Sequence, residues 1–196
     1  MKRPVVFADR DGTLIEEMGY LSRAEQVHVT PGAVSAVRRL NDAGIAVVVL
    51  TNQSGVARGL FSLADVEEVN HRVRELFTAE GATISGIYYC PHLPSAHDSP
   101  FGGVCICRKP YPGMAHEAAQ VLDLDLKRAY VVGDKLDDIG LANQLGVPGV
   151  LVRTGYGRDS EFLLGQRGAP KADFVVPNFE TAVEWILTRR TLAGAP

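Results

Sequence analysis

Two carboxylates stand two residues apart directly after an apolar run near the start of the chain. Asp9 and Asp11 belong to residues 9–13, Asp-Arg-Asp-Gly-Thr, which follow the apolar residues 5–8. One carboxylate of such a pair can attack an electrophile or bind a metal while the other moves a proton. Asp-Gly also marks ordinary turns, so a simple loop after a strand is an equal alternative for this motif alone.

Two more polar clusters follow predicted strands. Residues 51–55, Thr-Asn-Gln-Ser-Gly, come after the apolar run 45–50, and residues 133–135, Gly-Asp-Lys, come after 129–132. In open parallel sheets, ligands bind at the carboxyl ends of the strands. We therefore expect the three clusters to meet in one crevice, and three unrelated loops are the weaker alternative.

The residue types in this predicted crevice suit a phosphate ester. The hard carboxylate oxygens of Asp9, Asp11 and Asp134 are suitable ligands for Mg²⁺. Donors and cations that could bind phosphate oxygens are also present: Thr51, Asn52, Gln53, Ser54, Arg108, Lys109 and Lys135. Acids, Mg²⁺ and cations together predict phosphoryl transfer, and the sequence has no nucleotide-binding loop of the Gly-x-x-x-x-Gly-Lys type.

The three cysteines form a separate signal. Cys90 and His92 precede Cys105 and Cys107 on one predicted loop, and the chain has 3 Cys in all. Three thiolates and one imidazole make the tetrahedral set that structural Zn²⁺ prefers. A disulfide is a poor alternative because the count is odd, a catalytic thiol lacks a clear base, and unrelated buried cysteines remain possible. We expect a structural zinc-binding loop over residues 90–107.

Apolar runs alternate with helical patterns along the chain. Strands are expected at 5–8, 45–50, 84–89, 129–132, 150–152 and 174–176. One helix is expected to begin after the N-cap Thr30, with Pro31 at its first position, and another to begin at Ser62 with Asp65. Further helices are expected at 112–122, 137–145 and 179–187. This alternation predicts an α/β fold, a Rossmann-like parallel sheet with helices on both faces. Residues 153–157 follow the fifth strand and are interpreted as a turn, with a segment that borders the site as the alternative.

Length and composition narrow the class of protein. The 196 residues suit a single domain, here residues 1–190 with a frayed tail at 191–196, and residues 14–29 are too short for a large cap domain. A formal net charge of -3 offers no basic field for nucleic acid. The apolar run 45–50 is too short to span a membrane, and 5–8 is too short for a signal peptide. We expect a cytoplasmic monomer.

Taken together, the motifs resemble a known superfamily. Residues 9–13, Thr51, Lys109 and residues 133–138 look like the haloacid dehalogenase (HAD) phosphotransferases. The finer pattern is similar to the heptose bisphosphate 7-phosphatase family of that superfamily. It comprises Gly19-Tyr20, residues 51–55, Cys90-Pro91-His92, residues 105–110 and residues 133–135, in that order.

The resemblance implies roles at matching positions. Asp9 would be the nucleophile that forms an aspartyl-phosphate, Asp11 the acid and then the base, with Thr51 and Lys109 stabilising the phosphoryl group. Mg²⁺ would be held by the Asp9 carboxylate, the Asp11 backbone carbonyl and Asp134, with Asp138 acting through water. Arg108 would contact the phosphate of the substrate that is not cleaved. The residues that would bind the small phosphorylated sugar are Arg10, Glu17, Gly19, Tyr20, Asn52, Gln53, Ser54, Arg108 and Lys135.

Other functions remain open from the sequence. The family has Asp where this chain has Glu17 and often His where it has Met18, so the sugar contacts and preferred anomer are undecided. Histidinol-phosphate phosphatases share the catalytic and Cys/His motifs, but the twelve residues between His92 and Cys105 favour the heptose branch. A general sugar-phosphate phosphatase is a further alternative. An alternative from another functional class is a zinc-stabilised binding module without catalytic activity. Phosphate release in the presence of Mg²⁺ would distinguish a phosphatase from such a module.

Overall fold

A computed structural model describes residues 2–192 and contains a parallel sheet flanked by helices. Its strands and helices alternate in the order β1 (Arg3–Ala8), α1 (Ala33–Asp42), β2 (Ala46–Asn52), α2 (Leu63–Ala79), β3 (Gly86–Cys90), α3 (Gly113–Val121), β4 (Leu124–Gly133), α4 (Leu136–Leu145), β5 (Gly149–Val152), α5 (Gly157–Leu164), β6 (Phe174–Val176) and α6 (Phe179–Leu192). A short 3-10 helix, η1, spans Ala24–Gln26. The predicted α/β class is confirmed.

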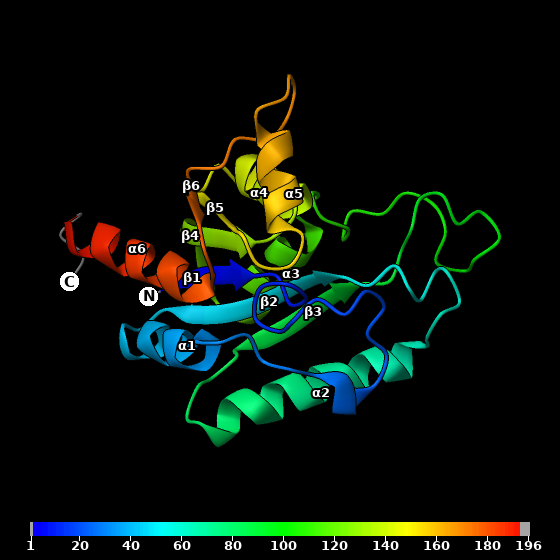
Figure 1. Cartoon of the computed structure of the whole chain (residues 1–196), viewed down its shortest axis with the longest axis horizontal. Helices are drawn as coiled ribbons and strands as arrows, with labels where there is room; N and C mark the ends of the chain where they lie inside the picture. Colours follow the sequence, from blue (N-terminus) through cyan, green and yellow to red (C-terminus); the bar gives the residue numbers. More distant parts are fainter. Residues whose placement is uncertain (1, 193–196) are drawn as a thin grey trace.

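The strands lie in the order β3-β2-β1-β4-β5-β6, and every recorded pairing is parallel. Val5 of β1 pairs with Ala46 of β2 on one side and with Ala129 of β4 on the other. The direction of strand addition reverses between β1 and β4, and such a reversal opens a crevice at the carboxyl ends of these strands. Figure 1 shows β1, β2 and β3 pointing to the same side of the molecule, where the long loop after β3 also lies.

Alternate residues of β1 pack against opposite layers of helices. Val6 and Ala8 face a core shared with α1, α2 and α6, whereas Val5 and Phe7 face a core shared with α3 and α4. All four side chains are at most 1% exposed. Burial of a Val or Phe side chain contributes about 1.5–3 kcal/mol. The central strand, and with it the position of Asp9 at its end, is therefore held from both faces.

The predicted start of the first helix was wrong. Thr30 does not cap α1, because its hydroxyl donates to the backbone carbonyls of Thr13 and Leu14 at 2.9 and 3.1 Å. The N-cap is Gly32, whose φ of 79° places it in the left-handed region that favours glycine. Thr30 instead ties the end of the connection before α1 to the turn after β1.

Several other boundaries differ from the prediction. β4 begins at Leu124 rather than at residue 129, since its exposed residues 127 and 128 are polar and hide the strand from an apolar pattern. Residues 153–157 were interpreted as a turn, but α5 begins within this segment at Gly157. α6 continues beyond residue 187 to Leu192, into the predicted frayed tail, and residues 193–196 lie outside the described part of the chain. The capping box of Ser62 and Asp65 at the start of α2 is confirmed.

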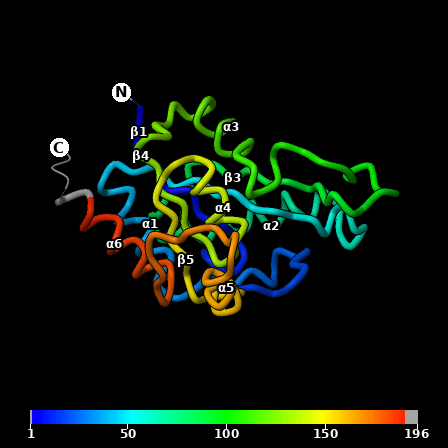
Figure 2. Tube along the Cα trace, turned by 90° about the horizontal axis from the view of Figure 1, so that it is seen from above, coloured from blue at the N-terminus to red at the C-terminus, as the bar shows by residue number. Residues whose placement is uncertain are grey.

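No large domain interrupts the described chain between β1 and β2, where only η1 and α1 occur. The most extended irregular segment joins β3 to α3, and Figures 1 and 2 both show it projecting from the end of the molecule opposite the end of α6. No helix within residues 2–192 is long and apolar enough to cross a membrane. The crevice is therefore bordered by loops rather than by an inserted cap domain.

Candidate active site

The turn after β1 places two carboxylates at the carboxyl end of the sheet. The backbone carbonyl of Arg10 accepts hydrogen bonds from the amides of Leu14 and Ile15, both at 3.0 Å. Gly12 adopts a φ of 81°, which a residue with a side chain rarely adopts. The chain therefore folds back on itself at this point, with Asp9 and Asp11 both lining one cavity.

Lys109 joins Asp9 to Asp138 inside the protein. Its ammonium nitrogen donates to Asp9 Oδ1 at 2.7 Å and to Asp138 Oδ1 at 2.6 Å, and all three side chains are at most 5% exposed. Burial opposes charge on Lys109, but Asp138 and Asp9 outweigh it and raise the pKa of the ammonium. Burial also acts to raise the pKa of Asp9, yet Lys109 and Lys135 outweigh it and lower that pKa. Asp9 is thus held as an anion beside a cation.

Three buried carboxylates form a cluster that could hold a metal ion. The side-chain oxygens of Asp9, Asp134 and Asp138 all lie within 4.8 Å of one another. Burial, followed by the charge of Asp9, raises the pKa of Asp134 to about 8. Its Oδ1 is buried and accepts no hydrogen bond from residues 2–192, although the Lys135 ammonium lies 3.9 Å away. An unsatisfied oxygen among hard anionic donors fits Mg²⁺.

Asp134 is enclosed by glycines and by the start of α5. Its Oδ2 accepts a hydrogen bond from the backbone amide of Tyr156 at 2.8 Å. A Cβ atom added to Gly12 or to Gly155 would collide with this same oxygen. The hydroxyl of Thr154 donates to the carbonyl of Gly12 at 2.5 Å and joins the two turns. The segment after β5 is therefore part of the wall around Asp134.

The carboxylate of Asp11 is not part of the acidic cluster and accepts hydrogen bonds from a set of neighbouring donors. Its Oδ2 accepts from Gln53 Nε2 at 2.8 Å and from the Thr51 hydroxyl at 3.3 Å. The guanidinium of Arg10 binds both carboxylate oxygens. The metal role implied above uses the backbone carbonyl of Asp11 and does not require this carboxylate. Arg10 is 1% exposed and does not line the cavity, so its predicted contact with substrate is not supported.

The cavity above these carboxylates measures about 230 Å³ and brings together most of the predicted site residues. Lys135 donates to Glu17 Oε2 at 2.9 Å, and its ammonium lies 4.9 Å from the centre of the Tyr156 ring. Burial opposes its charge, but Asp9, Asp134 and Glu17 raise its pKa. The remaining predicted lining residues are Gly19, Tyr20, Thr51, Asn52, Gln53, Ser54, Arg108 and Lys109.

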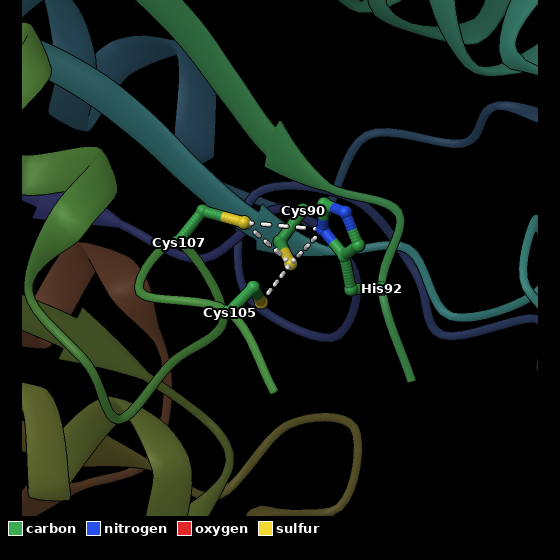
Figure 3. A group of neighbouring side chains, drawn as sticks. All are labelled: Cys90, His92, Cys105 and Cys107. Atoms are coloured by element: carbon green, nitrogen blue, oxygen red, sulfur yellow. Dashed lines mark hydrogen bonds between the residues drawn. The ribbon is translucent and has the colours of Figure 1, made fainter. Parts of the chain in front are cut away.

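The cysteine cluster lies beside this cavity, at the end of β3 and on the returning loop. Figure 3 shows Cys90, His92, Cys105 and Cys107 pointing toward one another. The Sγ atoms of Cys90 and Cys107 are 3.0 Å apart, and Cys107 Sγ is 3.3 Å from His92 Nδ1. All four ligand atoms lie within 4.8 Å of one another. Three sulfurs and one nitrogen in this arrangement fit a tetrahedral Zn²⁺ ion.

Three groups of site residues escaped the sequence analysis. Phe61 and Asp137 line the cavity although neither was predicted as a site residue, and so does Tyr156, from the segment 153–157 that was interpreted mainly as a turn. Gly155 belongs to the same segment, but a glycine after a strand is too common to indicate its contact with Asp134. Asn70 lies within α2 and binds Arg10 at 2.7 Å. A buried polar residue on the apolar face of that helix was the one available signal.

Known proteins resemble both the sequence and the fold. A family model described as HAD-hydrolase-like matches residues 106–182. The chain is 43% identical over 192 residues to the D-glycero-D-manno-heptose-1,7-bisphosphate 7-phosphatase of Thermosynechococcus vestitus, covering 96% of this chain and 97% of that protein. It is 37% identical over 195 residues to the D-glycero-beta-D-manno-heptose-1,7-bisphosphate 7-phosphatase of Escherichia coli K12, covering 98% and 92%.

A solved structure agrees with this likeness. The crystal structure of D,D-heptose 1,7-bisphosphate phosphatase from B. bronchiseptica, complexed with magnesium and phosphate, superposes with a TM-score of 0.82 at 34% identity. The match covers 96% of this chain and 99% of that one.

Proposed function

This chain belongs to the D-glycero-D-manno-heptose-1,7-bisphosphate 7-phosphatase family of HAD-like hydrolases, and we propose that it removes the C7 phosphate of D-glycero-D-manno-heptose 1,7-bisphosphate. The product would be heptose 1-phosphate. One observation carries the proposal more than any other. The buried Asp9 anion is paired with Lys109 in a cavity that Asp11 also lines.

The proposed first step is attack by the Asp9 carboxylate on the phosphorus of the C7 phosphate. Asp9 is suited to this step because its lowered pKa keeps it anionic. Lys109 offsets the negative charge of the transferring group at the same place, with help from Thr51 at the end of β2. The bond that forms joins Asp9 to phosphorus, and the bond that breaks joins phosphorus to the C7 oxygen.

Asp11 would manage the proton in both steps. As the bond between phosphorus and oxygen breaks, a protonated Asp11 gives its proton to the leaving sugar oxygen. In the second step its carboxylate takes a proton from water, and that water attacks the phosphorus of the aspartyl-phosphate. Asp9 and phosphate are then released and Asp11 is protonated again, so the cycle balances.

Mg²⁺ would be held by Asp9, Asp134 and the backbone carbonyl of Asp11, with Asp138 beside them. When bound, it would offset the charge of these acids and of the phosphate. The buried Oδ1 of Asp134, which accepts no hydrogen bond among the described residues and has only the Lys135 ammonium at 3.9 Å, supports this proposal. Magnesium and phosphate are present in the related structure from B. bronchiseptica.

The cysteine cluster would hold a structural Zn²⁺ ion, since its four side chains leave no position for a substrate. Cys107 lies two residues before Lys109, and the carbonyl of His92 accepts a hydrogen bond from Arg108 at 3.2 Å. A zinc ion that orders this loop would therefore fix the positions of both Arg108 and Lys109. We propose that Arg108 contacts the phosphate that is not cleaved, with Lys135, Glu17 and Tyr20 around the sugar.

The proposed setting is that of a monomeric enzyme of the cytoplasm acting on a small phosphorylated sugar. The absence of a membrane-spanning helix in residues 2–192 is compatible with it. Size-exclusion chromatography with light scattering tests the monomer, and cell fractionation tests the compartment.

The experiment that tests the function compares kcat/KM with Mg²⁺ for the two anomers of the heptose 1,7-bisphosphate and for histidinol phosphate. We expect one or both heptose anomers to be preferred by at least about 100-fold, because Arg108 then has a second phosphate to bind. Preference for histidinol phosphate contradicts the proposal. The absence of phosphate release from any phosphoester favours a binding module instead.

A further inference from the structure

Arg10 is a charged side chain enclosed within the protein. Its side chain is 1% exposed. Nε donates to Asp11 Oδ2 at 3.1 Å and Nη2 donates to Asp11 Oδ1 at 3.1 Å. The third nitrogen, Nη1, donates to Asn70 Oδ1 at 2.7 Å. Because a buried cation is tolerated only when it is paired, the contacts of Arg10 indicate its role.

The fork of Arg10 fixes the plane of the Asp11 carboxylate. A planar guanidinium that donates to both oxygens resists rotation of the carboxylate, which a single ammonium cannot do. The two oxygens of Asp11 are then not equivalent. Oδ2 also accepts from Gln53 at 2.8 Å and from Thr51 at 3.3 Å, whereas Oδ1 has Arg10 as its one hydrogen-bond partner among the described residues. The Arg10, Gln53 and Thr51 side chains therefore hold the Asp11 carboxylate in one orientation.

Asn70 fixes Arg10 in turn. It projects from α2, is 4% exposed, and lies sixty residues further along the chain. Its amide nitrogen is buried and has no hydrogen-bond partner. The reversed amide would aim that nitrogen at the guanidinium, donor against donor. The observed orientation therefore serves Arg10 although it leaves a buried donor unpaired.

We propose that Arg10, held by Asn70, is a positioning residue that fixes the orientation of the Asp11 carboxylate toward the leaving oxygen. The inference deepens the proposed function, because it rests on Asp11 as the acid of that mechanism. In that mechanism Asp11 gives up its proton as the bond between phosphorus and the leaving oxygen breaks. The proton is replaced from the water that later releases phosphate from Asp9. Arg10 does not line the cavity, and it acts only through the Asp11 carboxylate.

The test measures how strongly the first turnover depends on the leaving group. Aryl phosphates from p-nitrophenyl to phenyl phosphate span good to poor leaving groups, and only the poor ones need a proton. Arg10→Lys keeps the charge and removes the fork. Asn70→Leu removes the support of Arg10 without a change at the turn after β1, and it also removes the unpaired donor. Arg128→Lys, at a surface pair with Asp125, is the matched control.

We expect phenyl phosphate to react about 100-fold more slowly with Arg10→Lys, and p-nitrophenyl phosphate to change by about threefold or less. Asn70→Leu should shift the same ratio in the same direction by about tenfold, and Arg128→Lys should leave it unchanged. Equal losses for all leaving groups in both variants, or no loss, overturn the inference while the proposed function stands. If the wild-type chain hydrolyses no aryl or sugar phosphate, the proposed function fails and the inference fails with it.

Discussion

The side chain of Asn52 holds the backbone of Lys109 from both sides. Its Oδ1 accepts from the Lys109 amide at 3.0 Å, and its Nδ2 donates to the Lys109 carbonyl at 3.1 Å. β2 therefore fixes a residue of the loop that follows Cys107. The sequence analysis assigned Asn52 to the substrate, and the structure adds this second task.

Asn52→Ala should lower kcat by about tenfold to 100-fold, because Lys109 would no longer be held against Asp9. The matched control is Asn41→Ala. Asn41 makes the same two-way contact with the backbone of Thr83, at 3.2 and 2.7 Å, outside the site. Both variants should lose about 1–3 kcal/mol of unfolding free energy. Steady-state kinetics and urea unfolding check this, and equal kcat losses in the two variants would show that the Asn52 contact has no special role.

The stability of the metal-free chain should depend on pH through the acidic cluster. Burial raises the pKa of Asp134 to about 8 and that of Asp138 to about 6, whereas Asp in an unfolded chain titrates at about 3.9. Between these values the folded chain binds protons that the unfolded chain has released. The free energy of unfolding therefore falls as pH rises from about 4 to about 8, by up to about 1.4 kcal/mol per pH unit for one proton. The lowered pKa of Asp9 acts in a separate window, below its unfolded value.

Saturating Mg²⁺ should raise the melting temperature more at pH 8 than at pH 5, since protons and metal compete for the same carboxylates. Asp134→Asn should remove most of this difference. Thermal unfolding across that range, with and without Mg²⁺, makes the comparison. A metal effect that is the same at both pH values contradicts the proposed site.

Gly155→Ala should weaken the response to Mg²⁺. The new Cβ would collide with Asp134 Oδ2 and approach Gly12 Cα at 2.7 Å. Gly44→Ala is the matched control, because Gly44 has a similar positive φ of 71° but nothing within 4 Å of the added atom. The left-handed backbone costs each variant about 1–2 kcal/mol. We expect only Gly155→Ala to require more Mg²⁺ for half-maximal activity. The same increase in Gly44→Ala would contradict a specific role of Gly155 beside Asp134.

The cysteine cluster should bind zinc at about one ion per chain. His92→Ala should lose that ion, and it should also lower kcat because the loop that carries Arg108 and Lys109 is no longer ordered. His97→Ala, an exposed histidine on the same loop, is the control and should keep both zinc and activity. Metal analysis of the purified variants decides the matter. Full zinc content in His92→Ala would place the metal elsewhere.

Much of the fold followed from sequence because its signals are local. The buried strands are continuous apolar runs, and the capping box of Ser62 and Asp65 marks a helix start without help from the rest of the chain. The start of α1 was misjudged because a tertiary contact decided it. The hydroxyl of Thr30 is used by the turn after β1, sixteen and seventeen residues away.

The sequence predicts the reacting groups of the site better than it predicts the residues that hold those groups in place. Asp9, Asp11, Lys109 and Asp134 stand in motifs whose spacing is visible in the sequence. Arg10 lies inside such a motif, and it was predicted to contact the substrate. Its burial against Asn70 depends on the packing of α2, to which the motif gives no guide.

The most direct test of the account follows the two phosphates of D-glycero-D-manno-heptose 1,7-bisphosphate by phosphorus NMR in the presence of Mg²⁺. With the wild-type chain the C7 phosphate signal should disappear and that of the C1 phosphate should persist, whereas with Asp9→Asn both should remain. Asp11→Asn should still release p-nitrophenol from p-nitrophenyl phosphate in a first turnover, because that leaving group needs no proton. Loss of the C1 phosphate instead, or turnover by Asp9→Asn at the wild-type rate, would contradict the proposed covalent 7-phosphatase.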